Sequence, residues 1–97
     1  MAIGVLFEFS GVTKEQYEQV SRGLTGGGLL ARFSDWPVPG ILFHMAGPTD
    51  DGWRVVDVWE SPEAFEAFAQ RIMPLLAEAG MPANPPSVFP VHNLHTR

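Results

Sequence analysis

The chain has no cysteine among its 97 residues, which excludes disulfide bridges, zinc–thiolate sites and thiol nucleophiles. Basic residues are also scarce. Six lysines and arginines stand against eleven aspartates and glutamates, giving a formal net charge of −5. Such a chain has little positive surface with which to neutralise phosphate groups. We therefore expect neither nucleic acid nor an anionic membrane surface to be a partner.

Long hydrophobic runs are absent as well. No segment approaches the roughly 20 apolar residues that a membrane-spanning helix needs. The first apolar stretch, residues 2–7, has no cationic leader and is interrupted by Glu8, unlike a signal peptide. The expected location is therefore the cytoplasm. Because 45% of the residues are apolar, the length suits one folded domain over residues 1–97.

Four segments rich in β-branched and aromatic residues predict strands. They are residues 2–9, 41–46, 53–59 and 87–94. The turn signal at residues 47–52 predicts that the second and third strands form a hairpin. Pro90 lacks an amide hydrogen, so we expect the last strand to lie at a sheet edge or to contain a bulge.

Two segments predict helices. Thr13 and Gln16 have the spacing of a capping box, which predicts a helix over residues 14–22, terminated by Gly23 and the triplet of Gly26, Gly27 and Gly28. Ser61 followed by Pro62 is typical of a second helix start, with an expected end at Gly80. Pro74 lies inside that second segment and should kink or shorten the helix.

A long segment without regular structure is predicted between the first helix and the second strand. Residues 25–40 are rich in glycine and proline and contain the isolated Trp36. Loops of this length in a small domain are usually functional or mobile, so the segment is a candidate lid. Trp36 has no core to join unless the loop folds over other residues.

The predicted order is strand, helix, strand, strand, helix, strand. The simplest arrangement is a ferredoxin-like α+β fold, with both helices on one face of a four-stranded antiparallel sheet. The strands do not alternate apolar and polar residues, since residues 5–7, 41–43 and 55–56 are consecutively apolar. The face without helices would therefore be apolar, and we expect a second copy of the chain to cover it in a homodimer.

The chain resembles the dimeric α/β-barrel superfamily, in particular small proteins related to the antibiotic-biosynthesis monooxygenases. The resemblance is carried by residues 39–44 (PGILFH), residues 51–65 (DGWRVVDVWESPEAF) and residues 91–94 (VHNL), and it extends over nearly the whole chain. It implies a homodimer with a pocket between sheet and helices in each subunit. Members include cofactor-independent oxygenases, cyclases, haem-degrading enzymes and isomerases. The superfamily has no universal catalytic motif that can be carried over to these residues.

His44 and Asp57 are the candidate catalytic pair. His44 lies in an otherwise apolar strand, and side chains on a strand alternate between the two faces. If the hairpin turn is centred on Asp50 and Asp51, His44 lies opposite Asp57; a turn one residue later places it opposite Trp59. An aspartate beside a histidine fixes one imidazole tautomer and raises its basicity, as suits a general base. The alternative is a purely structural pair whose members satisfy each other's hydrogen bonds.

Other candidate residues are aromatic or polar. Trp36 and Trp59 are candidates for the walls of a pocket that binds a flat aromatic molecule, although aromatic residues, Tyr17 among them, are more often core. In the last predicted strand, His92 and Asn93 point to opposite faces, so at most one enters the pocket as a hydrogen-bond donor. The histidines lack metal-ligand spacing, so we expect no metal site.

Four interpretations of the function remain open on the sequence. The first is an enzyme that needs no cofactor and acts on an aromatic or polyketide-like compound, by oxygenation or by a proton transfer such as cyclisation. The second is a binding or stress-associated homodimer with no catalytic activity that uses the same pocket. A solid structural core without a ligand is a third alternative, and haem binding is a further one. The sequence does not decide whether the chain is an enzyme.

Overall fold

A computed structural model describes residues 1–82 and 84–97 of the chain. Its strands are β1 (Ile3–Ser10), β2 (Ile41–Thr49), β3 (Gly52–Trp59) and β4 (Ser87–Pro90). Its helices are α1 (Lys14–Thr25) and α2 (Pro62–Glu78), with a short 3-10 helix, η1 (Phe33–Asp35), between α1 and β2. The predicted order of strands and helices is confirmed.

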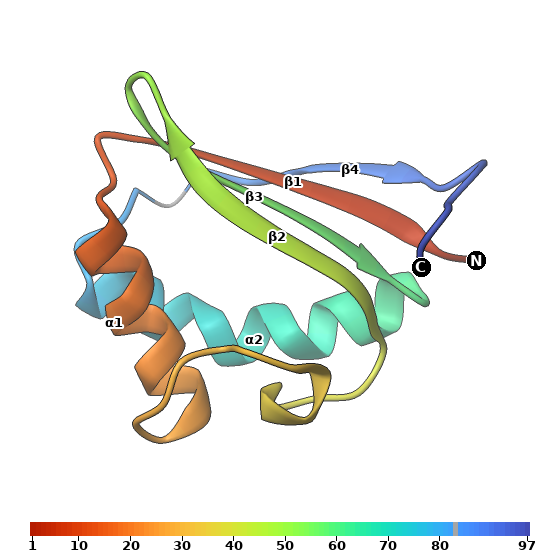
Figure 1. The fold of residues 1–97 in the computed structure, drawn as a ribbon, viewed down its shortest axis with the longest axis horizontal. Helices are drawn as coiled ribbons and strands as arrows, with labels where there is room; N and C mark the ends of the chain where they lie inside the picture. Colours follow the sequence, from red (N-terminus) through yellow and green to blue (C-terminus); the bar gives the residue numbers. More distant parts are fainter. Residues whose placement is uncertain (83) are drawn as a thin grey trace.

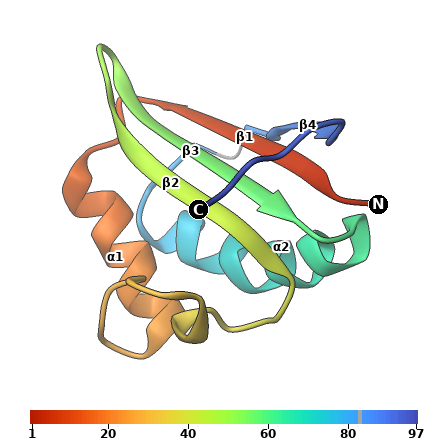
Figure 2. The same ribbon diagram turned by 45° about the vertical axis from the view of Figure 1, so that its right-hand side comes forward.

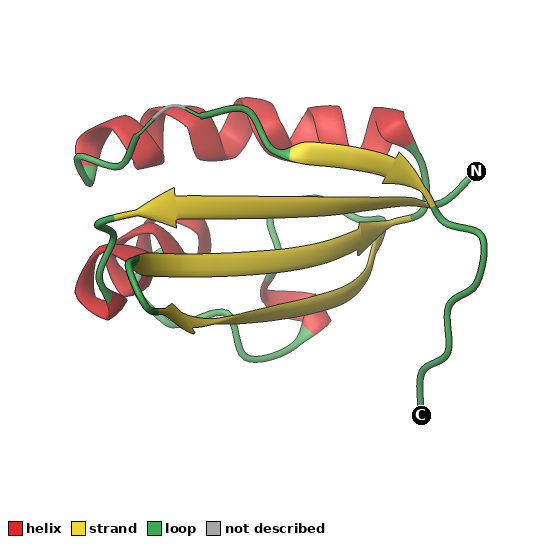
Figure 3. Cartoon of the chain, turned by 90° about the horizontal axis from the view of Figure 1, so that it is seen from above, coloured by secondary structure: helices red, strands yellow, loops and turns green. Residues whose placement is uncertain are grey.

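The four strands form one antiparallel sheet in the order β2-β3-β1-β4. Figure 1 shows both helices on the same side of this sheet, and Figure 3 looks onto the other side, where the strands lie uncovered by helices. The fold is therefore α+β, in two layers, and compatible with the predicted ferredoxin-like arrangement. The layer between sheet and helices contains the core.

Helix α1 begins as predicted but ends later. The Thr13 hydroxyl accepts from the Gln16 amide and the Gln16 side chain accepts from the Thr13 amide, which confirms the capping box. Gly23 does not terminate the helix, which extends three residues beyond the predicted range to Thr25. Gly23 lies within the helix against α2, where an added Cβ would be 2.8 Å from Leu75 Cδ2. The helix ends at Gly26, the first residue of the predicted glycine triplet, whose positive φ of 80° suits glycine.

Helix α2 begins at Pro62 with Ser61 as the N-cap residue, as predicted. The helix does not stop at Pro74 but continues to Glu78. Because proline has no amide hydrogen, the usual bond to the carbonyl of Gln70 cannot form. Phe68 is the only fully buried residue among the 17 of this helix. Helix α2 therefore packs loosely for its length.

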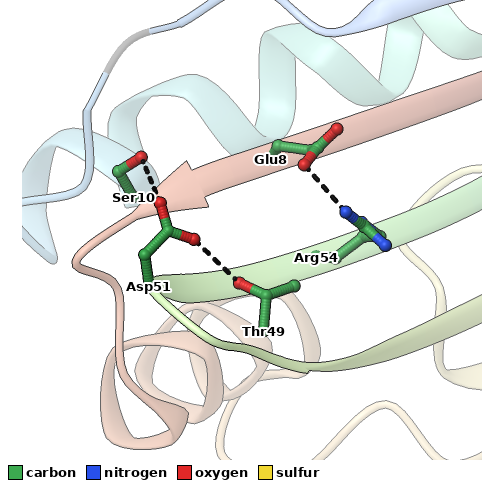
Figure 4. A network of polar contacts seen from close by, with 5 residues as sticks. All are labelled: Glu8, Ser10, Thr49, Asp51 and Arg54. Carbon is green, nitrogen blue, oxygen red and sulfur yellow. Dashed lines mark hydrogen bonds and ion pairs between the residues drawn. The ribbon is translucent and has the colours of Figure 1, made fainter.

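The hairpin is longer than predicted and has a shorter turn. Residues 47–49 were expected in the turn, but they continue strand β2. Pro48 is tolerated there because β2 is an edge strand, with hydrogen bonds to β3 alone. The turn consists of Asp50 and Asp51, between the paired residues Thr49 and Gly52. Figure 4 shows the polar network at this end, in which Asp51 accepts hydrogen bonds from Ser10 and Thr49.

Strand β4 is shorter than predicted. It ends at Pro90 rather than at residue 94, and it pairs with only the first half of β1. One further backbone bond, from the Val91 amide to the Ala2 carbonyl, holds the chain before it leaves the sheet. The expectation that Pro90 lies at a sheet edge is confirmed, since β4 is the outer strand beside β1.

The two faces of the sheet differ in character. Alternate residues of β1 and β3 point into the helix layer and are buried; these are Ile3, Val5, Phe7, Phe9, Trp53, Val55, Asp57 and Trp59. The opposite, open face is apolar in part. Leu6, Phe43 and Val56 are half-buried there, while Met45 is 55% exposed and Phe89 is 50% exposed.

Towards the hairpin turn the open face becomes charged. Arg54 Nη2 lies 3.0 Å from Glu8 Oε2, and both side chains are exposed to solvent (Figure 4). An exposed ion pair of this kind contributes about 0–1 kcal/mol to stability. The apolar part of the open face is therefore limited to the half away from the turn.

Candidate active site

The hairpin places His44 directly opposite Asp57. With the turn at Asp50 and Asp51, the first of the two predicted registers is the one observed. Both side chains point into the helix layer, and His44 Nδ1 lies 2.6 Å from Asp57 Oδ1. The predicted contact between the two residues is thus present, within the core of the domain.

Helix α1 adds a third residue to this pair. The hydroxyl of Tyr17 lies 2.7 Å from His44 Nε2. Tyr17 was expected only as a core or wall residue; its place on the apolar face of α1 was visible in the sequence, but its histidine partner was not. The three side chains form one continuous chain of hydrogen bonds from α1 through β2 to β3.

Burial controls the ionisation of the aspartate. Asp57 is 1% exposed, and its pKa is raised above the ordinary value of 3.8 because burial penalises the charged form. The hydrogen bond and the charge of His44 lower the pKa in part. The nearby indole N–H of Trp59 also lowers the pKa of Asp57. This N–H has no hydrogen-bond partner of good geometry among the described residues. Asp57 therefore depends on His44 for its stabilisation as a carboxylate.

With Asp57 in its carboxylate form, hydrogen-bond chemistry assigns the roles of the two imidazole nitrogens. A carboxylate only accepts hydrogen bonds, so His44 donates to Asp57 from Nδ1–H. In the neutral ring, Nε2 is then an acceptor, and the Tyr17 hydroxyl donates to it. Burial raises the pKa of Tyr17, the negative charge of Asp57 adds to this, and the neighbouring Ser21 opposes it. Tyr17 is therefore a neutral hydroxyl donor near pH 7.

A cavity of about 40 Å³ lies beside these residues. Tyr17, His44 and Asp57 all line it, and apolar side chains make up the rest of its wall: Phe7, Phe9, Val20, Leu30, Trp36, Val55, Phe68, Ile72, Leu76 and Met81. A volume of this size accommodates one or two water molecules but not an aromatic ring. A substrate-sized cavity at His44 was the expected sign of a ligand site, and the observed cavity is smaller than that.

Trp36 closes the cavity on one side. Its ring centroid lies 4.9 Å from that of His44, 5.2 Å from Phe68 and 5.8 Å from Trp59. Figure 2 shows the loop that carries it on the helix side of the sheet, between α1 and the start of β2. The loop thus folds over the core residues, as the isolated tryptophan required.

The tip of this loop is held by its own hydrogen bonds. Asp35 Oδ2 accepts from the amides of Ala31 and Arg32, and these two bonds hold the pKa of Asp35 below its usual value. At the start of the loop, Gly26 and Gly27 both have positive φ angles. A loop tip held by hydrogen bonds, next to a glycine segment with wide conformational freedom, is consistent with the predicted lid.

The remaining predicted site residues lie elsewhere. Trp59 is fully buried beneath Trp36 and is not among the residues that line the cavity. His92 and Asn93 follow the end of β4, are exposed, and line a hollow on the open face beside Val58. The structure brings neither residue to His44, because the strand that was expected to position them ends at Pro90.

Among residues 1–82 and 84–97, no three histidine, cysteine, aspartate or glutamate side chains cluster in a way that could hold a metal ion. Both nitrogens of His44 already have hydrogen-bond partners. No helix in the described part of the chain has the length and hydrophobicity to cross a bilayer.

Comparisons with known proteins identify no relative: no protein-family model, curated protein or solved structure matches the chain. The resemblance to the dimeric α/β-barrel superfamily thus remains a prediction from the residues quoted above.

Proposed function

We propose that this protein is a cofactor-independent enzyme that removes a proton from a small, largely apolar molecule. The observation that carries the proposal is the hydrogen-bonded series Tyr17–His44–Asp57, which lines a cavity inside an otherwise apolar core. A buried carboxylate beside a histidine is costly to maintain unless the pair is hydrogen-bonded. Here the series continues to a tyrosine hydroxyl, which is an arrangement able to transfer a proton.

The proposed step moves one proton along this series. The oxygen of Tyr17 accepts a proton from an acidic C–H or O–H of the substrate as its own proton passes to His44 Nε2. The products are a substrate enolate or phenolate, a neutral Tyr17 and an imidazolium next to the Asp57 carboxylate. General base catalysis of this kind typically accelerates a reaction by about 10²–10⁴-fold. Return of the proton to another substrate atom completes an isomerisation. In a cyclisation the enolate carbon attacks a carbonyl carbon of the same molecule, and the resulting alkoxide takes up the proton. Addition of the anion to dioxygen, the co-substrate and oxidant, gives oxygenation.

The same proposal includes a homodimer that forms through the open face of the sheet, as in the dimeric α/β-barrel superfamily. Its support is the apolar half of that face, with Met45 and Phe89 at least half exposed. Exposed apolar side chains in one patch favour association, since each contributes about 1.5–3 kcal/mol when fully buried. The polar series lies on the other face, so pairing of two copies leaves the cavity in place.

A second candidate is ligand binding without catalysis, or a purely structural role for the three residues. The small volume of the cavity favours this candidate, because no aromatic molecule fits beside His44 while Trp36 covers it. The two candidates differ in what they predict for a weakly acidic carbon acid. Only the enzyme accelerates the loss of its proton.

The test uses β-tetralone, a bicyclic ketone with an acidic methylene group, deuterated at that position. We expect the protein to accelerate the exchange of deuterium for solvent hydrogen, followed by proton NMR, and the variant His44→Ala to lose this acceleration. An oxygen electrode distinguishes oxygenation from simple exchange. Equal rates for the native protein, His44→Ala and buffer would contradict the enzymatic proposal and leave the non-catalytic one.

A further inference from the structure

A second, larger hollow lies beside the cavity at His44. It is a groove of about 380 Å³ between the C-terminal half of α2 and the segment that leads into β4. The described residues that line it are Phe7, Phe65, Ala69, Ile72, Met73, Leu76, Ala77, Met81, Asn84, Pro85 and Pro86. Among these, Asn84 alone has a polar side chain and none is charged. Its volume lies within the roughly 300–1,000 Å³ typical of small-molecule sites.

The groove exists because β4 is short and α2 packs loosely. Strand β4 pairs with β1 only from Ile3 to Leu6, so Phe7 has no β4 residue beside it. On the opposite wall, Ile72 and Leu76 are only half-buried, and Met73 is 60% exposed. Apolar side chains of α2 thus face a space that no other part of the described chain fills.

Four residues separate this groove from the cavity at His44. Phe7, Ile72, Leu76 and Met81 line both spaces, so the partition between them is a single layer of side chains. Methionine side chains are flexible, and Pro74 removes one backbone hydrogen bond from the turn that carries Ile72 and Leu76. Small movements of these side chains would join the two spaces.

We propose that the groove binds the apolar body of the substrate, while its acidic group reaches Tyr17 through the partition. The inference rests on the proposed function and defines the class of substrate. The ligand is a neutral molecule about the size of a fused bicyclic ring system, with one weakly acidic hydroxyl or enol group. A charged body is disfavoured because no charged side chain lines the groove.

The binding test uses β-naphthol, with naphthalene as the matched compound that lacks the hydroxyl. Ala77 is exposed and lines the groove, so Ala77→Trp should fill its mouth without disturbing the core. Gln70 is exposed on the same helix but does not line the groove, which makes Gln70→Trp the control. We expect Ala77→Trp to weaken β-naphthol binding by at least about tenfold and Gln70→Trp to change it by less than about twofold.

Nuclear Overhauser effects locate the bound ligand independently of these variants. We expect contacts from β-naphthol to the methyl groups of Met73 and Met81, and weaker binding of naphthalene. Unchanged binding by Ala77→Trp, contacts only to Met45 on the open face, or no binding at millimolar concentration would each overturn the inference.

The β-tetralone measurement separates this inference from the proposed function. If β-naphthol binds in the groove but deuterium exchange is not accelerated, binding in the groove is supported and the enzymatic proposal is contradicted. If exchange is accelerated but Ala77→Trp leaves the KM for β-tetralone unchanged, the enzymatic proposal is supported and binding in the groove is contradicted.

Discussion

The hydroxyl of Tyr17 and the Nε2 atom of His44 are 2.7 Å apart, while Nδ1 of the same ring contacts Asp57. Both nitrogens of the imidazole are therefore engaged within the protein. In the proposed reaction, the substrate meets the tyrosine oxygen at the end of the series, with the histidine behind it. The proposal therefore gives the proton-accepting position to Tyr17, and the hydrogen-bonded series contains one residue more than the pair predicted from the hairpin.

Replacement of Trp36 by alanine should open the cavity. The variant loses the contacts of the indole with His44, Phe68 and Trp59, and we expect it to lower the free energy of unfolding by about 2 kcal/mol, less than for a fully buried tryptophan. If the loop is a lid, the association rate of β-naphthol should rise. Chemical denaturation and stopped-flow fluorescence measure the two effects.

Phe33→Ala is the matched control for Trp36, because Phe33 is a 57% exposed aromatic residue of the same loop. It should change stability by less than about 0.5 kcal/mol and leave the association rate unaltered. An equal change in association rate for both variants would argue against a specific lid role for Trp36.

The buried Asp57 predicts a defined pH dependence of stability. Its pKa in the folded state is raised above 3.8, chiefly by burial. Below 3.8 the group is protonated in both states and its contribution is fully present; as the pH rises through the folded pKa, the folded protein must bury the charge and that contribution is lost. The unfolding free energy of the native protein, minus that of Asp57→Asn, should therefore fall as the pH rises through this range. A difference that rises instead would contradict the raised pKa.

The hairpin register depends on the close approach of Gly52 to β1. A Cβ added at Gly52 would lie 1.9 Å from the backbone carbonyl oxygen of Phe9, so the backbone must move to accept it. We expect Gly52→Ala to lower the free energy of unfolding by about 3 kcal/mol. Gly47, in the same hairpin, has no atom within 4 Å of such a Cβ, and Gly47→Ala should be nearly neutral. Equal effects in thermal unfolding would contradict the observed register.

The open face predicts self-association. Sedimentation velocity at micromolar concentration should show a dimer, and Met45→Glu should convert it to a monomer by placing a charge in the apolar half of that face. Met73→Glu is the control, because Met73 is similarly exposed but lies on α2. A native protein that sediments as a monomer would contradict the dimer, and equal dissociation by both variants would place the interface elsewhere.

Local patterns in the sequence predicted much of the fold. The helix starts at Thr13 and Ser61 follow from side chains that hydrogen-bond to nearby amides, and such contacts depend only on adjacent residues. The pairing of His44 with Asp57 was one of two registers that the sequence left open, since a two-residue turn fixes the register of a hairpin but two positions of the turn were possible.

Features that depend on tertiary packing could not be predicted. Glycine is typical of helix ends, but Gly23 lies within α1, where α2 approaches closely at Leu75. Tyr17 is 27 residues from His44, and only the packing of α1 beneath the hairpin brings them together. His92 and Asn93 were placed by extending the last strand past Pro90, where the chain instead leaves the sheet.

The rate of β-tetralone deuterium exchange by Tyr17→Phe tests the proton series most directly. This variant keeps the ring and removes only the hydroxyl that contacts His44 Nε2. We expect kcat to fall by about a hundredfold with KM nearly unchanged, because the apolar contacts that bind the substrate remain. A Tyr17→Phe protein that exchanges at the native rate would show that the proton does not pass through Tyr17 and would contradict the proposed series.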